Sequence, residues 1–103
     1  RAGDIDEAIE LYEEIMLRFP NFSQAYSEAA WAYKLNNQPD LAISSIRSAI
    51  SISSDPNQWY FIRAGKIFEW TGDINEAVES YNQALEINSK NKTAIRRLKN
   101  LSE

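Results

Sequence analysis

The sequence predicts an all-α protein, an α-solenoid of about six helices arranged as antiparallel helix–turn–helix repeats. The first reason is an internal repeat, because residues 3–10 (GDIDEAIE) closely resemble residues 72–79 (GDINEAVE), and residues 37–44 form a weaker copy between them. The three copies begin 34 and then 35 residues apart, and such a period is typical of stacked helical repeats. The second reason is that apolar residues recur every three or four positions around these copies, which is the spacing of one helix face.

The first predicted helix spans residues 4–19. Asp4 precedes the apolar stripe and Glu7 follows three residues later, which is the pattern of a capping box. Pro20 ends the helix, because the residue before a proline is disfavoured in the helical conformation. The predicted apolar stripe consists of Ile5, Ala8, Ile9, Tyr12, Ile15, Met16 and Phe19.

Two helices follow in the next repeat. Ser23 is predicted to cap a helix from Gln24 to about Asn36, because serine accepts well from the free N–H groups of a first turn. Pro39 suits the first position of the second helix, where its missing N–H costs nothing. The two apolar faces consist of Tyr26, Ala29, Ala30 and Tyr33, and of Ile43, Ile46, Ala49, Ile50 and Ile52.

The last repeat has the same organisation. A helix from Gln58 to Thr71 ends at Gly72, whose backbone freedom allows a tight interhelical turn. Asp73 then begins a helix in which Glu76 completes a second capping-box pattern. A terminal helix from about Lys92 to Ser102 is predicted from Ile95, Leu98 and Leu101.

The amino-acid composition argues against an enzymatic function. The chain has neither cysteine nor histidine, so it lacks a thiolate nucleophile, a Cys-based zinc site and the usual general base near neutral pH. The acidic clusters Asp6–Glu14 and Glu76–Glu79 fit solvated helix faces, and no calcium-loop pattern occurs. We therefore predict that the chain is not an enzyme and binds no cofactor and no metal.

Charge is unevenly distributed. Residues 1–89 carry six Lys and Arg against fourteen Asp and Glu, whereas residues 90–103 carry five basic residues against Glu103 alone. The acidic body disfavours nucleic acid. The basic end either complements the dipole of a final helix or attracts an anionic partner. No apolar run is long enough to insert into a membrane, and with no cysteine and no signal segment a cytoplasmic location is favoured.

These residues resemble the tetratricopeptide repeat (TPR) family across nearly the whole chain. Repeat 23–56 matches through Tyr26, Ala29, Ala30, Tyr33, Ala42 and Ala49, and repeat 58–89 through Phe61, Ala64, Gly65, Phe68, Gly72, Ala77, Tyr81 and Ala84. Residues 3–20 look like the second half of a repeat, and the terminal helix 91–102 looks like a first half. Ile46 departs from the family by replacing an aromatic residue, and Asn37 by replacing the turn glycine.

The resemblance implies a single right-handed superhelical array over residues 1–103, in which the first helix of each repeat lines a concave groove. It implies a scaffold that binds a peptide or helix of a partner protein. The alternative is an accessory or oligomerisation segment of a larger enzyme or of a secretion or assembly complex. The residues predicted to face the groove are Gln24, Ser27, Trp31, Lys34, Trp59, Ile62, Lys66, Glu69, Thr93, Arg96 and Asn100.

Two readings of the tryptophans stay open. Trp31 and Trp59 either form an aromatic floor of the groove or fill gaps between helices, and Trp70 is expected to be packed. The first reading rests on the enrichment of tryptophan at binding hot spots. Chaperone-binding members of the family hold a carboxylate with a Lys/Asn/Arg clamp, and the corresponding positions here carry Ser27, Trp31, Ile62 and Lys66. Only a fragment of that clamp exists, so we expect no recognition of an Hsp70 or Hsp90 tail.

The half-repeat at the start leads to a further expectation. Because no first helix precedes residues 4–19, part of their apolar stripe should be uncovered. We expect either that the parent protein extends on this side, since the chain does not begin with methionine, or that this face mediates self-association.

Overall fold

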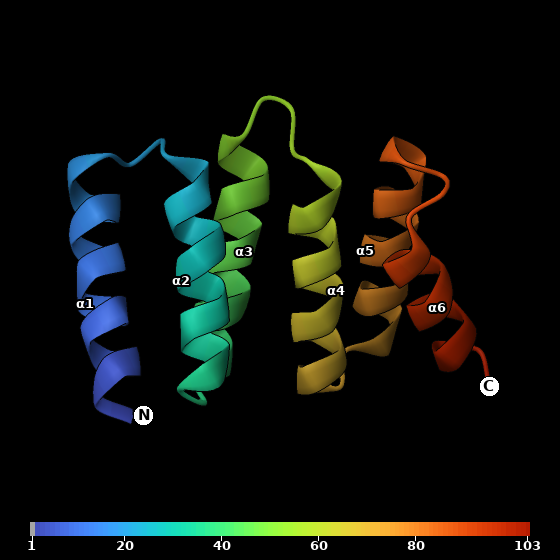
Figure 1. Ribbon diagram of the computed structural model, residues 1–103, viewed down its shortest axis with the longest axis horizontal. Coiled ribbons are helices and arrows are strands. Elements are labelled where there is room, and N and C mark those ends of the chain that lie inside the picture. The colour runs from blue at the N-terminus through green and yellow to red at the C-terminus, as the bar shows by residue number, and fades with distance from the viewer. Residues whose placement is uncertain (1) are drawn as a thin grey trace. The chain divides into compact units, whose positions relative to one another are not determined.

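The computed structural model describes residues 2–103, with side chains from Gly3 onward. Over these residues the chain is all-α, as predicted, and forms six helices (Figure 1). They are α1 (Ala2–Arg18), α2 (Ser23–Leu35), α3 (Pro39–Ile52), α4 (Gln58–Thr71), α5 (Ile74–Ile87) and α6 (Lys92–Leu101).

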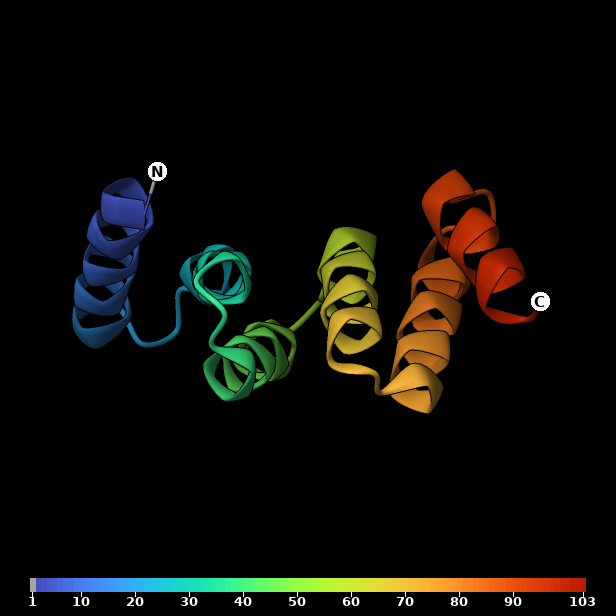
Figure 2. The same cartoon turned by 90° about the horizontal axis from the view of Figure 1, so that it is seen from below.

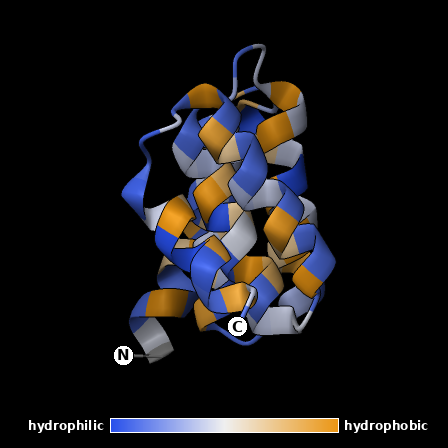
Figure 3. Cartoon of the chain, turned by 90° about the vertical axis from the view of Figure 1, so that its right-hand side faces the viewer, coloured by the Kyte–Doolittle hydropathy of each residue, from blue (hydrophilic) through white to orange (hydrophobic). Residues whose placement is uncertain are grey.

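The helices form two compact units, one ending at Asp55 and one beginning at Pro56. In the first unit α2 contacts both α1 and α3, and in the second α5 contacts both α4 and α6 (Figures 1 and 2). Hydrophobic and hydrophilic residues alternate along the helices (Figure 3). This pattern is that of amphipathic helices, each of which buries one stripe against its neighbours.

Small residues form the centre of each unit. In the first unit Ala29, Ala30, Ala42 and Ala49 are fully buried together with Ile46. Alanine at these positions lets the helices approach closely, because a larger side chain would separate the two backbones. The predicted small residues therefore lie at the helix contacts.

In the second unit a glycine lets two helices approach closely. A Cβ atom added to Gly65 of α4 would lie 2.5 Å from Cε1 and 2.5 Å from Cζ of Tyr81 in α5. Tyr81 is fully buried. Only glycine leaves room for this ring, so Gly65 is required by packing and not by its backbone conformation.

Several predicted helix ends are confirmed. Pro39 begins α3, and α1 ends at Arg18, before Pro20. Gly72 follows α4 in the left-handed conformation with φ of 85°. Asn37 stands at the equivalent place of the preceding repeat and is also left-handed, with φ of 57°. Asparagine tolerates this conformation better than most residues, which explains how it replaces the turn glycine.

The predicted caps at the other helix starts are wrong in detail. Asp4 lies inside the first turn of α1, because that helix already begins at Ala2. Ser23 is the first residue of α2, since Ala25 N donates to Phe22 O at 3.1 Å and starts the helix one residue earlier. Asp73 does occupy the N-cap of α5, but its carboxylate accepts from the Thr71 hydroxyl at 2.7 Å instead of capping the helix.

The apolar stripe of the first helix is covered only in part, as the sequence led us to expect. Ile9 is buried, whereas Phe19 is exposed. Phe19 follows the last residue of α1, and its N–H still donates to Ile15 O at 2.7 Å.

Candidate partner-binding surfaces

The predicted residues of the first unit lie on α2. The Lys34 ammonium stands over the Trp31 ring, 4.9 Å from its centroid, which is within the range of a cation–π contact. Trp31 and Lys34 are both half-buried, and Gln24 is exposed. Ser27 is only 4% exposed, so the prediction of an accessible Ser27 is wrong. Its small side chain lies on the packed side of α2, where Ala30 is also buried.

An open depression of about 460 Å³ lies between α1 and α2. Its residues come from both helices and from the turn that joins them: Tyr12, Ile15, Phe22, Gln24, Ala25 and Glu28. The surface is therefore partly apolar, with one acidic and one amide side chain at its edge. Gln24 is the predicted site residue that contributes to it.

The predicted residues of the second unit lie on α4 and α6. Trp59 is 57% exposed, which makes it available to a partner. Trp70 was expected to be packed, but more than a third of its surface is exposed. Ile62 is only 3% exposed, so its predicted accessibility is wrong. Gly65, which lies three residues later on the same helix face, is also buried.

Lys66 lies within a cationic cluster. Burial lowers the pKa of the Lys66 ammonium, and repulsion from three nearby guanidinium groups lowers it further. These groups belong to Arg97, Arg96 and Arg63, whereas Glu69 acts in the opposite direction. Four cationic side chains around a single carboxylate produce a local positive potential that favours a negatively charged ligand.

The cluster is anchored through Glu69. The Tyr81 hydroxyl donates a hydrogen bond to Oε2 of Glu69, and Arg97 Nη1 lies 3.6 Å from Oε1 of the same carboxylate. Arg97 Nε is buried without a hydrogen-bond partner among the described residues. The charge of Glu69 is thus engaged by neighbours inside its own unit.

Sequence reasoning assigned Arg96 to the site and missed Arg97 and Arg63. Arg96 is exposed, whereas Arg97 is half-buried against Glu69. Helical spacing could have identified Arg97, because it lies three residues after the buried Ala94 and therefore on the same face of α6. Asn100 is exposed and Thr93 is half-buried.

A second polar network joins α4 to the turn between α5 and α6. Gln58 Oε1 accepts from Asn88 Nδ2 at 3.0 Å and from Asn91 Nδ2 at 2.6 Å. Asn91 also caps α6, because its Oδ1 accepts from Ala94 N at 3.0 Å. The network was not foreseen from the sequence. It holds α6, with Arg96 and Arg97, against the other helices of its unit.

Two tyrosine–carboxylate pairs predict a fall in stability at alkaline pH. Burial, followed by the hydrogen bond to Glu13 and its charge, raises the pKa of Tyr33 to about 12. Burial and Glu69 also raise the pKa of Tyr81. Unfolded tyrosines release their protons near pH 10, so the stabilisation is complete below pH 10 and is lost as the pH rises through about 12.

Urea unfolding measured from below pH 10 to about pH 12 checks this expectation. Tyr33→Phe lacks one titrating hydroxyl and should show a smaller fall over this range than the wild type. Parallel curves for the two proteins would contradict the assigned role of the Tyr33–Glu13 pair.

Two other possible features of the described part of the chain are a metal site and a membrane-spanning helix. No group of three or more His, Cys, Asp and Glu side chains there could hold a metal ion. None of the helices described over residues 2–103 combines the length and the apolar character that a membrane span requires.

Comparison with known proteins identifies similar repeats and folds. A family model described as tetratricopeptide repeat matches residues 23–56 and 60–91, and a second model of the same description matches residues 1–21. These ranges overlap the two predicted repeats and the predicted half-repeat. No curated protein sequence matches the chain.

Several solved structures are similar. The first TPR of Spaghetti (RPAP3), bound to the HSP90 peptide SRMEEVD, is 25% identical, with a TM-score of 0.89 over 97% of this chain and 79% of that chain. The NMR structure of the first TPR domain of human RPAP3 is also 25% identical, with a TM-score of 0.88 over 97% and 78%. MamA is 19% identical, with a TM-score of 0.86 over 96% and 57%.

Proposed function

The chain belongs to the tetratricopeptide repeat family, and from this premise we propose that it is a protein-interaction scaffold that binds an acidic peptide segment of a partner. The observation that carries the proposal is the position of Lys66 among three guanidinium groups. Proteins of this family are generally scaffolds without catalytic activity. A partner peptide is therefore a more fitting ligand for this cluster than a substrate.

The electrostatics favour carboxylates. Repulsion from the three arginines destabilises the charged form of Lys66 in the free protein. A bound carboxylate would relieve this repulsion and would form charge-assisted hydrogen bonds with the cluster. Glu69 cannot fully supply this neutralisation, because it already accepts from Tyr81 and faces Arg97.

An aromatic residue supplies the apolar part of the proposed interaction. Trp59 exposes more than half of its surface on α4 of the second unit, and Arg63 lies four residues later on the same helix face. An exposed tryptophan beside basic groups suits a peptide that alternates acidic and apolar side chains, because tryptophan contributes strongly where a partner excludes water.

The similar structure with a bound HSP90 peptide provides a suitable probe, because the peptide SRMEEVD is acidic. The sequence led us to expect no recognition of an Hsp90 tail, because the carboxylate clamp is incomplete. The cationic cluster revises that expectation, since it offers a second mode in which the acidic side chains of the peptide bind near Lys66. Since the family's carboxylate clamp is present only in part, amidation of the peptide's C-terminus should change the affinity less than replacement of the acidic side chains by amides (SRMQQVN).

Lys66→Gln is the variant that tests the cluster. We expect it to weaken binding of SRMEEVD about tenfold, or about 1.4 kcal/mol, because one of the cationic groups is removed. Isothermal titration calorimetry at low and high salt measures the effect, and the loss should shrink as salt screens the cluster. Thermal unfolding should show unchanged or higher stability, since the variant removes a repulsive charge.

Lys90→Gln is the matched control, because Lys90 is exposed in the turn before α6 and should leave binding unchanged. Equal affinity of the wild type for SRMEEVD and SRMQQVN would contradict an acidic-peptide site. Equal losses in the two lysine variants would show a general charge effect and would contradict the role given to Lys66.

A further inference from the structure

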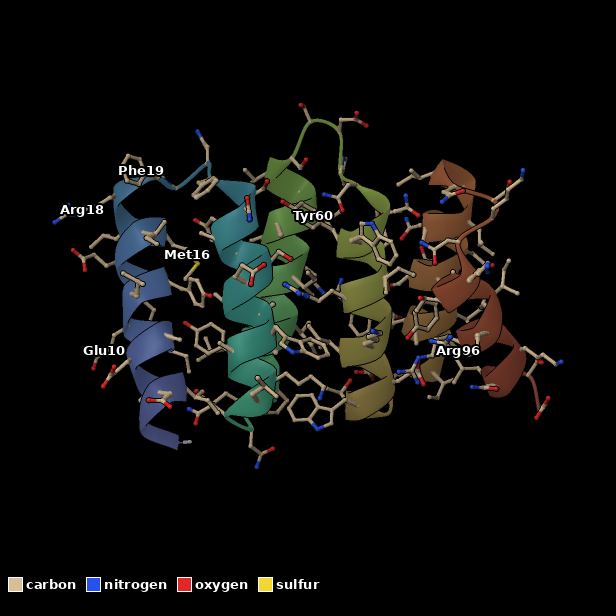
Figure 4. The ribbon with its side chains drawn as sticks, in the orientation of Figure 1. Glu10, Met16, Arg18, Phe19, Tyr60 and Arg96 are labelled. Carbon is tan, nitrogen blue, oxygen red and sulfur yellow. The ribbon has the colours of Figure 1, made fainter. Side chains whose placement is uncertain are left out.

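The side of α1 that faces away from α2 carries exposed apolar residues. Ile9 of α1 is buried, and Leu11, two residues later, lies about 200° around the helix from it. Leu11 is accordingly 56% exposed. Figure 4 shows Glu10 and Arg18 projecting away from α2, whereas Met16 points toward it.

Acidic residues flank this apolar position. Glu7 lies four residues before Leu11 and Glu14 lies three residues after it, so all three share one helix face. Both glutamates are exposed. Glu14 forms an exposed ion pair with Arg18, with 3.1 Å between Oε1 and Nη2. Along this face of α1, the apolar Leu11 therefore lies between two acidic residues.

The exposed face of α6 has the opposite charges. Ile95 is 48% exposed, with Lys92 three residues before it and Lys99 four residues after it. Both lysines are exposed. Along the chain, the glutamates lie four residues before and three residues after Leu11, whereas the lysines lie three residues before and four residues after Ile95. The two faces match when their helices run antiparallel.

We propose that α6 of one copy packs antiparallel on α1 of a second copy of this chain, with Ile95 against Leu11. In this register Lys99 stands opposite Glu7, and Lys92 stands opposite Glu14. Apolar contact provides the attraction. The two charge pairs fix orientation and register more than they add affinity, because exposed ion pairs contribute little energy.

Charge disfavours the simpler arrangement in which two α1 helices pair with each other. That contact would bring the glutamates of the two copies together, and like charges that face each other across an interface are unfavourable. The α1–α6 contact joins different surfaces of the two copies. Both closed pairs and open chains of copies satisfy it.

Sedimentation equilibrium of the 103-residue chain over a range of concentrations tests the proposal. We expect an average mass above that of the monomer that increases with concentration and decreases with added salt. Two charge-reversal variants, Glu7→Lys/Glu14→Lys and Lys92→Glu/Lys99→Glu, should each be monomeric alone and should associate when mixed, because each then offers the other complementary faces. Circular dichroism verifies that both remain folded.

Other outcomes would overturn the proposal. A wild-type chain that stays monomeric at every concentration excludes the contact. Association of the Lys92→Glu/Lys99→Glu variant at wild-type strength would show that α6 takes no part in it. Failure of the two variants to associate on mixing would exclude the paired charges. Leu11→Gln should also weaken association without a change of charge, and an unaffected Leu11→Gln variant would contradict the apolar contact.

Discussion

Replacing Gly65 with alanine is expected to lower the free energy of unfolding by up to about 2 kcal/mol, despite the higher helix propensity of alanine. The added Cβ would lie 2.5 Å from the ring of Tyr81. That ring cannot move aside easily, because it is fully buried and its hydroxyl donates to Glu69. Overpacking of this kind costs about 1–3 kcal/mol, and the propensity gain of about 1 kcal/mol offsets only part of it.

The other unit suggests how to relieve this clash. At the positions equivalent to Gly65 and Tyr81, 35 residues earlier, the chain has Ala30 and Ile46, and both are fully buried. A larger residue on one helix is thus matched by a smaller one on the other. We expect Gly65→Ala/Tyr81→Ile to recover part of the stability lost in Gly65→Ala.

Urea unfolding measures these differences, and Gly3→Ala is the control. No atom lies within 4 Å of a Cβ built on Gly3, so this substitution should be neutral or slightly stabilising. A Gly65→Ala protein as stable as the wild type would show that the helices separate at little cost.

Replacing Asn91 with alanine is expected to cost about 3 kcal/mol. The change removes the acceptor that caps α6 and leaves the Ala94 N–H unsatisfied. Asn91 is only 3% exposed, so water does not readily replace this acceptor, and an unsatisfied buried group costs about 1–3 kcal/mol. The change also removes one of the two amide donors to Gln58 Oε1, a hydrogen bond worth about 1 kcal/mol.

Asn57 provides the matched control, because it stands 34 residues earlier and caps α4. Its side chain accepts from Trp59 N at 2.9 Å and from Tyr60 N at 3.2 Å, both within the cap, and it is exposed. Asn57→Ala should therefore cost only about 1 kcal/mol. Asn91→Asp keeps the acceptor for Ala94 N and should fall between the two alanine variants.

Chemical denaturation and amide hydrogen exchange check this pair. In Asn91→Ala, exchange should accelerate most in α6, because its first turn loses the side-chain acceptor. Equal destabilisation by Asn57→Ala and Asn91→Ala would mean that the bonds to Gln58 add nothing to the cap.

The candidate site was predicted only in part. Lys66, Glu69 and Arg96 were identified from their helical register, and all three belong to or adjoin the cationic cluster. The same register placed Ser27 and Ile62 on an accessible face, where the structure has them buried. Register gives the direction of a side chain on its own helix, but it does not tell how closely the next helix approaches.

The all-α class, the repeat and most helix boundaries could be predicted from apolar spacing, Pro39 and Gly72, because these features act through the local backbone. The contacts between helices could not be predicted in this way: Tyr81 packs against Gly65, and Asn91 bonds to Gln58, 33 residues away. Such contacts join residues distant in sequence, and they depend on the volumes and donors that face each other once the helices pack.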